Sequence, residues 1–195
     1  MVRISSGIYK NRALKTSRHN LIRPTTSRVK LSFFDILQHD VRETVFLDGF
    51  AGSGNIGIEA LSRGAEYLVF IDELPEALAL IRHNLDKINV STDKYRIVKG
   101  DFNRSVIALA QGELRFDIIY LDPPYELLRV ANPLKVVFKR KILKPGGMVV
   151  LERPAAIDRF RNFPFLHCFR SQKIGKKTLD FFTYPENLSA ESDQP

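Results

Sequence analysis

The sequence predicts a doubly wound α/β fold, in which a mostly parallel sheet of seven strands follows a basic N-terminal extension with a β-hairpin and a helix. Three observations carry this prediction. Apolar segments typical of buried strands alternate with amphipathic segments typical of helices, and this alternation calls for a parallel sheet covered on both faces. Successive apolar segments end in an aspartate. The last two strand-like segments are joined by a short link, which favours an antiparallel hairpin at the sheet edge.

The extension, residues 1–27, is distinguished by its charge. Residues 1–30 contain eight basic side chains and no acid, whereas the other 165 residues contain 22 of each, so the net charge of +8 lies at the N-terminus. Apolar residues are interleaved with the basic ones, and Gly7 suits a hairpin turn. We interpret the segment as an ordered arm for RNA phosphates, although a solvated tail is the simpler alternative. The residues expected to contact RNA are Arg3, Lys10, Arg12, Lys15, Arg18, Arg28 and Lys30.

The segment Arg23-Pro24-Thr25-Thr26-Ser27 ends the arm and caps the next helix, and the sheet domain spans residues 28–185. Pro75 suits the first turn of a helix, and Lys144-Pro145-Gly146-Gly147 ends another. Residues 186–195 are polar and acidic and are expected to be disordered. Helices are predicted over 28–38, 54–63, 75–87, 103–112 and 132–143. Strands are predicted over 44–48, 67–72, 95–99, 116–122, 147–152, 165–171 and 178–184.

A glycine-rich turn follows the first of these strands. Asp48 ends the strand, and Gly52 and Gly54 allow a ligand close to the backbone at a helix N-terminus. Residues 52–57 also match the dinucleotide fingerprint, a weak signal by itself. A carboxylate at the strand tip would repel a pyrophosphate, but it suits the ammonium of an amino-acid-like ligand. S-adenosylmethionine therefore fits better than NAD.

Two more acids end strands that are expected to point to the same edge. Asp72 comes eighteen positions after Gly54, which is the usual place for a carboxylate that accepts from ribose hydroxyls. Asp101 follows the next strand and could accept from an adenine amino group. A single acid at a strand end is usually a turn or N-cap residue. A succession of them indicates a ligand site, because open α/β sheets bind ligands at the carboxyl ends of their strands.

The most informative stretch is Asp122-Pro123-Pro124-Tyr125, directly after the strand over 116–122. Proline fixes φ and lacks an N–H group, so the loop projects from the sheet. The Asp122 carboxylate and the Pro123 carbonyl offer two acceptors, and Tyr125 offers a flat ring. Together these groups suit a planar base with an exocyclic NH2 group.

Composition narrows the possible classes of protein. No apolar run approaches the length of about 20 residues needed to span a membrane, and the N-terminus has no signal-peptide pattern. The single cysteine, Cys168, cannot form an internal disulfide, which agrees with a cytoplasmic protein. His19, His39, His83 and His167 lack metal-ligand spacing, so no metal is expected.

On these residues the chain resembles class I S-adenosylmethionine-dependent methyltransferases and, more narrowly, the RsmD family, which methylates N2 of a guanine in 16S ribosomal RNA. Two stretches narrow the resemblance from methyltransferases in general to the RsmD family: Arg23-Pro24-Thr25 and Ala60-Leu61-Ser62-Arg63-Gly64-Ala65. The chain departs from the family pattern at Gly49, at Asn55 and at Lys10-Asn11-Arg12, where the family usually has Arg-Gly-Arg.

The resemblance implies a Rossmann-like fold and transfer of a methyl group from S-adenosylmethionine, with S-adenosyl-L-homocysteine as product. It implies guanine 966 of 16S rRNA as the target, within the small ribosomal subunit or its assembly intermediate, and a monomeric enzyme. The catalytic residues would be Asp122, Pro123, Pro124 and Tyr125. The residues around the cofactor would be Arg23, Pro24, Thr25, Asp48, Phe50, Ala51, Gly52, Ser53, Gly54, Asp72, Glu73, Asp101 and Phe102.

Three alternatives remain open from the residues alone. A methylase that modifies the amino group of adenine in DNA or RNA would use the same chemistry. A non-catalytic RNA-binding protein would explain the arm but not the loop at Asp122. A nicotinamide-dependent oxidoreductase would share the sheet, but no lysine, tyrosine or histidine is positioned after the fourth strand for that chemistry.

Overall fold

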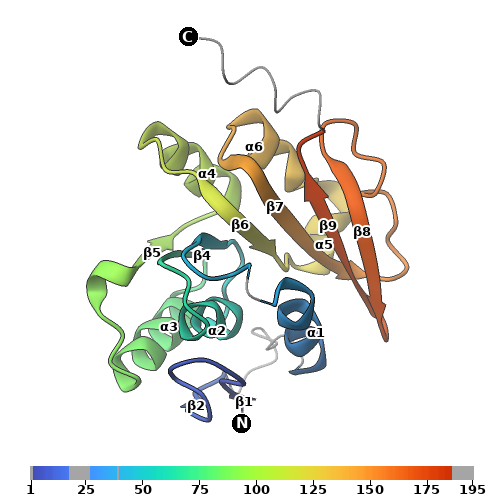
Figure 1. Ribbon diagram of the computed structural model, residues 1–195. Helices are drawn as coiled ribbons and strands as arrows, with labels where there is room; N and C mark the ends of the chain where they lie inside the picture. The colour runs from blue at the N-terminus through green and yellow to red at the C-terminus, as the bar shows by residue number, and fades with distance from the viewer. Residues whose placement is uncertain (1, 18–26, 39, 186–195) are drawn as a thin grey trace.

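The computed structural model describes residues 2–17, 27–38 and 40–185 (Figure 1). A sheet of seven strands crosses the molecule in the order β5-β4-β3-β6-β7-β9-β8. All neighbours from β5 to β7 are parallel, whereas β9 runs antiparallel to both β7 and β8. The predicted fold class is therefore confirmed. The strands are β3 (Val45–Asp48), β4 (Tyr67–Asp72), β5 (Tyr95–Lys99), β6 (Phe116–Leu121), β7 (Leu143–Pro154), β8 (His167–Ile174) and β9 (Lys177–Thr183).

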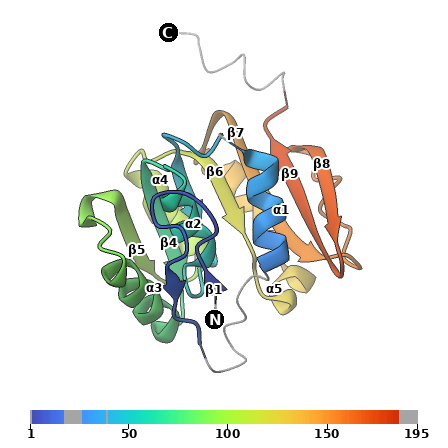
Figure 2. The ribbon, with the colours of Figure 1, turned by 60° about the horizontal axis from the view of Figure 1, so that its bottom comes forward.

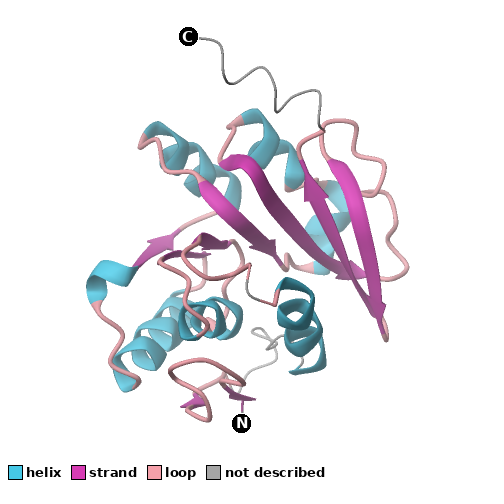
Figure 3. Cartoon of the chain, in the orientation of Figure 1, coloured by secondary structure: helices cyan, strands magenta, loops and turns pink. Residues whose placement is uncertain are grey.

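Helices cover both faces of the sheet (Figures 1 and 3). In β3, Phe46 packs into the core that holds α1, α2 and α3, and the next residue, Leu47, packs into the core that holds α4, α5 and α6. Side chains alternate in this way along a strand because its period is two residues, and both faces are apolar because both are covered. The helices are α1 (Ser27–Leu37), α2 (Asn55–Ser62), α3 (Pro75–Lys87), α4 (Phe102–Gln111), α5 (Tyr125–Val130) and α6 (Leu134–Lys139), with a 3₁₀ turn η1 at Thr92–Lys94.

The chain order reverses at β3. The chain moves from β3 outward to β4 and β5, and then returns to the other side of β3 to form β6. Such a switch point separates the loops that follow β3 and β6, and it is where open α/β sheets bind their ligands. The loops after Asp48 and Leu121 therefore flank the usual ligand position of this architecture.

One stretch differs from the sequence prediction. The predicted helix over 132–143 is wrong in extent: α6 covers only Leu134–Lys139, α5 precedes it, and β7 already begins at Leu143. The Lys-Pro-Gly-Gly stretch lies inside β7, at an irregular register opposite Phe116 and Ile118. A Cβ atom on Gly147 would lie 2.8 Å from the carbonyl oxygen of Asp117, so glycine permits the strands to approach there.

The N-terminal arm is folded against the helices (Figure 2). Strands β1 (Val2–Arg3) and β2 (Ala13–Leu14) pair antiparallel, so the predicted hairpin is confirmed (Figure 1). Gly7 has a φ of 81°, and a Cβ atom there would lie 1.7 Å from the carbonyl oxygen of Ser62 in α2. The N–H group of Ile8 donates to that same oxygen at 2.8 Å. The turn at Gly7 thus brings the backbone of the arm into direct contact with the end of α2.

Candidate active site at the carboxyl ends of the strands

The predicted acids gather at one edge of the sheet. Asp48 lies in register with Phe70 of β4 and Tyr120 of β6, and Asp72 lies in register with Lys99 of β5. These strands are parallel, so their carboxyl ends and the loops that follow them meet at the same edge (Figure 1). The charge of Asp72 raises the pKa of Asp48, and the charge of Asp48 in turn raises the pKa of Asp122.

Asp48 lies at the centre of this edge. Its side chain is buried and accepts a hydrogen bond from the N–H group of Gly57 in α2 at 3.0 Å. Burial, helped by the charges of Asp72 and Glu152 and opposed by the Gly57 N–H group, raises the pKa of Asp48 to about 7. A buried carboxylate without an equal positive charge favours a cationic ligand.

The glycine-rich turn is tied to Asp72. The N–H groups of Gly52 and Leu74 donate to the two carboxylate oxygens of Asp72 at 2.8 and 2.9 Å. Gly52 and Gly54 have φ values of 54° and 77°, a left-handed conformation that glycine adopts readily. Each carboxylate oxygen has a further lone pair, so Asp72 is able to accept from vicinal hydroxyl groups as well. Within the turn, Ala51, Ser53 and Gly54 are buried, whereas Glu73, the residue after Asp72, is exposed.

Two stacked aromatic rings lie next to the glycine-rich turn. Phe50 stacks on Phe102 with ring centroids 4.9 Å apart. A Cβ atom on Gly49 would lie 2.8 Å from the Phe102 ring and 2.6 Å from the Leu121 side chain. The departure from the family pattern at Gly49 therefore has a packing reason, because Phe102 and Leu121 fill the space that a larger side chain would need.

Asp101 has a structural role at this edge. It is the N-cap of α4, and its carboxylate accepts from the N–H group of Arg104 at 3.0 Å. The N–H group of Gly100 donates to the carbonyl oxygen of Asp72 at 3.0 Å, which fixes the loop beside β4. The side chain of Asp101 is exposed. Its predicted contact with an adenine amino group stays a prediction.

The loop after β6 presents Asp122 and Tyr125. The Asp122 side chain is 19% exposed, and its Oδ2 atom lies 3.7 Å from Nζ of Lys177. Burial, together with the charges of Glu152 and Asp48 and against the opposing effect of Lys177, raises the pKa of Asp122 to about 8. Pro123 is buried, while Tyr125 begins α5 and is 40% exposed, so its ring is accessible from solvent.

Sequence reasoning missed three residues beside Asp122. Glu152 of β7 accepts a hydrogen bond from the hydroxyl group of Tyr120 and another from Nζ of Lys177. Burial raises the pKa of Tyr120 well above its usual value, and the charges of Glu152 and Asp122 raise it further. Burial alone would lower the pKa of Lys177, but Asp122 and Glu152 outweigh it and raise the pKa. Sequence reasoning missed Lys177 because it assigned this residue to the link before the last strand. It missed Glu152 because this residue was only the last position of a predicted apolar strand.

Five of the seven residues predicted to contact RNA are exposed in the structure: Arg3, Lys10, Arg12, Lys15 and Arg28. Arg18 lies outside the described residues, and so do Arg23, Pro24 and Thr25 of the predicted cofactor site.

Lys30 is a correction to the sequence analysis, because it is only 1% exposed and cannot contact RNA. Its Nζ atom pairs with Oε2 of Glu59 at 2.8 Å and donates to the carbonyl oxygen of Arg3 at 2.8 Å and to Oδ1 of Asn55 at 3.0 Å. Glu59 also accepts from the N–H groups of Ser5 and Ser6. This buried pair connects α1, α2 and the arm. Its position follows from helical spacing, since Lys30 shares a face of α1 with Phe33, Phe34 and Leu37.

The arm is also connected to the glycine-rich turn. Asn84 of α3 accepts from the N–H group of Lys15 at 2.8 Å and donates to the carbonyl oxygen of Lys15 at 2.9 Å. The same amide donates to the carbonyl oxygen of Ser53 at 3.0 Å. The described part of the arm therefore lies on the helices next to the glycine-rich turn, and its basic residues Arg3, Lys10, Arg12 and Lys15 are exposed.

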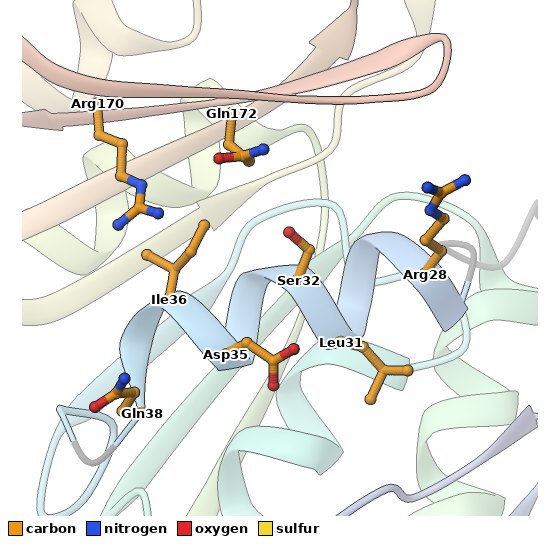
Figure 4. Close-up of a pocket in the computed structure, with 8 residues that line it drawn as sticks. All are labelled: Arg28, Leu31, Ser32, Asp35, Ile36, Gln38, Arg170 and Gln172. Atoms are coloured by element: carbon orange, nitrogen blue, oxygen red, sulfur yellow. The ribbon is translucent and has the colours of Figure 1, made fainter.

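A polar groove of about 540 Å³ lies between α1 and β8 (Figure 4). Arg28 stands at one end of α1, and Arg170 reaches from β8 over the other end (Figure 4). None of the strand-end acids lines this groove, so it is distinct from the candidate active site. Its lining residues are Arg28, Leu31, Ser32, Asp35, Ile36, Gln38, Arg170 and Gln172.

In the described part of the chain, no helix has the length and apolarity that crossing a membrane requires. The same residues contain no cluster of three or more histidine, cysteine or acidic side chains arranged to hold a metal ion.

Comparison with known proteins identifies relatives over almost the whole chain. The Haemophilus influenzae protein named Ribosomal RNA small subunit methyltransferase D is 31% identical over 152 residues, which cover 77% of this chain and 78% of that protein. The structure of a hypothetical protein from Thermus thermophilus superimposes with a TM-score of 0.79 at 26% identity and covers 93% of this chain and 98% of that one.

An RNA methyltransferase from Salinibacter ruber, solved in complex with S-adenosyl-L-homocysteine, has a TM-score of 0.64 at 22% identity over 84% of this chain and 95% of that one, a likeness of fold. The family model described as Conserved hypothetical protein 95 matches residues 2–183. This chain therefore belongs to that family, the RsmD family of methyltransferases.

Proposed function

We propose that the protein transfers the methyl group of S-adenosylmethionine to the exocyclic N2 atom of a guanine in 16S ribosomal RNA of the small ribosomal subunit. The observation that carries this proposal is the pairing of Asp48 and Asp122. Asp48 ends β3 and Asp122 follows the neighbouring parallel strand β6, both side chains are largely buried, and the charge of Asp48 raises the pKa of Asp122. Family resemblance points to guanine 966 as the target.

The residues at the strand ends fit S-adenosylmethionine, a cationic ligand. Asp48, Asp122 and Glu152 bring three carboxylates together, with Lys177 as the cation beside them. Asp48 and the turn at Gly52 and Gly54 would hold the amino-acid part. Asp72 would accept from the ribose hydroxyls, and Phe50 and Asp101 would border the adenine. The Salinibacter ruber enzyme of the same fold, solved with S-adenosyl-L-homocysteine, supports this cofactor.

The loop after β6 would hold the substrate base. S-adenosylmethionine, when bound, supplies an electrophilic methyl group. The Asp122 carboxylate and the Pro123 carbonyl would accept the two N–H bonds of the guanine amino group, which makes the nitrogen lone pair more available and orients it. Asp122 is also the nearest acceptor for the proton that the amino nitrogen loses as its bond to carbon forms. Stacking on the exposed face of Tyr125 would contribute about 1–3 kcal/mol to base binding.

The basic arm would bind the RNA backbone. Arg3, Lys10, Arg12 and Lys15 are exposed on the arm, and Arg28 lies at the start of α1. We therefore treat residues 1–27 as an RNA-binding extension of the methyltransferase domain at residues 28–185. Arg170, which lines the groove together with Arg28, is a further candidate for phosphate contact. All of these groups come from one chain, so a monomer suffices, and the ribosomal substrate implies a cytoplasmic protein.

The loop at Asp122 would also accept the amino group of adenine, so an adenine methylase is the second candidate. Incubation with methyl-labelled S-adenosylmethionine and unmethylated small subunits, followed by digestion to nucleosides and mapping of the labelled position, separates the two. We expect label in N2-methylguanosine at a single position of 16S rRNA, and no label with Asp122→Asn. Label in N6-methyladenosine, or only in DNA offered in parallel, would overturn the proposed substrate.

A further inference from the structure

A chain of polar contacts extends from Asp122 into the sheet. Nζ of Lys177 lies 3.7 Å from Oδ2 of Asp122 and donates to Oε1 of Glu152. The other oxygen of Glu152 accepts from the hydroxyl group of Tyr120. The Glu152 side chain is 0% exposed, and those of Lys177 and Asp122 are 21% and 19% exposed. Lys177 therefore bridges a fully buried carboxylate and the carboxylate that faces the substrate.

The strand pairing explains how a residue so late in the chain reaches this position. Lys177 begins β9, which runs antiparallel to β7, and it lies opposite Pro154 at the end of β7. Because β9 runs opposite to β3, β6 and β7, it starts at the edge of the sheet where those three strands end. Its first residue, Lys177, therefore lies at the same edge as the loops after β3 and β6. Ladder hydrogen bonds on both sides of β9 fix this residue in the sheet.

The groups around Asp122 mostly favour its protonated form, and Lys177 opposes them. Asp48 of β3 and Glu152 of β7 both carry negative charge toward Asp122, and Tyr120 of β6 and Tyr125 of α5 are the neutral titratable groups nearby. Burial and both carboxylates favour the protonated form of Asp122, and Lys177 opposes all three. A protonated Asp122 would place an O–H donor where the substrate amino group needs an acceptor.

We propose that Lys177 is a positioning residue that favours the ionised form of Asp122 and orients its carboxylate toward the substrate amino group, and that Glu152 holds Lys177 in place. This inference rests on the proposed function, in which Asp122 accepts from that amino group. Lys177 itself does not touch the base. Glu152 acts in two ways, because its charge disfavours an ionised Asp122 while its hydrogen bond fixes the lysine that favours one.

Two substitutions of Lys177, one that removes its positive charge and one that keeps a positive charge, separate electrostatic positioning from a structural role. Lys177→Met removes the cation and keeps the apolar stem, and Lys177→Arg restores a cation. Lys176→Met is the matched control, since Lys176 is the exposed residue directly before β9 and its replacement removes the same charge. The titration of Asp122 is followed by carbon-13 NMR of its carboxyl group, assigned with Asp122→Asn. The rate of a single methyl-transfer turnover is measured across pH on the same proteins.

We expect Lys177→Met to raise the titration midpoint of Asp122 by about one pH unit or more and to move the rate profile to higher pH by the same amount. Lys177→Arg should restore most of the shift, and Lys176→Met should match the wild-type protein. Glu152→Gln should lower the Asp122 midpoint and also lower the maximal rate, because Lys177 loses its anchor.

An unchanged Asp122 midpoint in Lys177→Met would overturn the proposal, whatever happens to the rate. An equal loss of rate at every pH without a shifted midpoint would mean that Lys177 is only structural, which overturns it too. If Lys177→Met does not fold, as judged by circular dichroism, the titration on Lys177→Gln decides by the same criterion. If the wild-type protein transfers no methyl group to any offered nucleic acid, the proposed function fails, while the NMR titration still decides the role of Lys177.

Discussion

Replacing Asp48 by asparagine should stabilise the fold at neutral and alkaline pH. Burial raises the pKa of Asp48 from 3.8 to about 7, so the folded protein holds a proton on this group over a range in which the unfolded chain has lost it. A group whose pKa is raised by folding contributes a stability that falls as pH rises from its unfolded to its folded value. At pH 8, ionisation of Asp48 therefore destabilises the native state by up to about 4 kcal/mol, at 1.36 kcal/mol for each of about three pKa units.

Asparagine keeps the shape of the side chain and an oxygen that can accept from the N–H group of Gly57, but it does not ionise. Urea unfolding at pH 5 and pH 8 would compare the wild-type protein with Asp48→Asn and with Asp35→Asn. Asp35 is an exposed carboxylate on α1 and serves as the charge-matched control. From pH 5 to pH 8, the stability difference between Asp48→Asn and the wild-type protein should grow by about 2–3 kcal/mol in favour of the variant.

A variant less stable than the wild-type protein at pH 8 would refute this reasoning. It would mean that the native protein holds an ionised Asp48 with enough positive charge around it to compensate for burial. The same variant should bind S-adenosylmethionine more weakly, so its gain in stability would come at the expense of the proposed function.

Three further outcomes are expected. Glu59→Gln leaves Lys30 charged and buried without its ion-pair partner, so the free energy of unfolding should fall by about 3–5 kcal/mol in urea titrations; a loss below about 1 kcal/mol would contradict this. Replacing Lys10 and Arg12 by glutamine should reduce the slope of the logarithm of RNA affinity against the logarithm of salt concentration by about 0.7 per lost contact, while calorimetry shows unchanged affinity for S-adenosylmethionine. An unchanged slope would mean that these two residues do not contact the RNA. Tyr125→Ala should weaken substrate binding by about 5- to 150-fold and Tyr125→Phe much less, because the ring face makes the contact; equal effects in RNA-binding titrations would assign the role to the hydroxyl group.

Residue periodicity predicted the parts of the fold that depend on local patterns. Strands β4 and β5 and helix α3 have the predicted bounds, because runs such as Leu68–Ile71 and the proline at 75 mark them directly. The gathering of Asp48, Asp72 and Asp122 was also predictable, since the carboxyl ends of parallel strands share one edge.

The residues that the sequence did not assign depend on contacts between distant segments. Lys177 and Glu152 meet through antiparallel pairing of β7 with β9, and no local pattern gives that register. The burial of Lys30 had a signal in the sequence, because its spacing to Phe33 and Leu37 is that of one helix face. Glu59, its partner, is flanked by the apolar residues Ile58 and Ala60 in α2. Lysine side chains are usually exposed, and this general tendency led to the wrong prediction that Lys30 contacts RNA.

A crystal structure of the protein with S-adenosyl-L-homocysteine would test the proposed site directly. We expect the amino-acid part against Asp48 and the turn at Gly52, the ribose hydroxyls on Asp72, and the sulfur atom facing Asp122 and Tyr125. A ligand bound in the groove between α1 and β8, or an Asp122 side chain turned away from the sulfur atom, would contradict it.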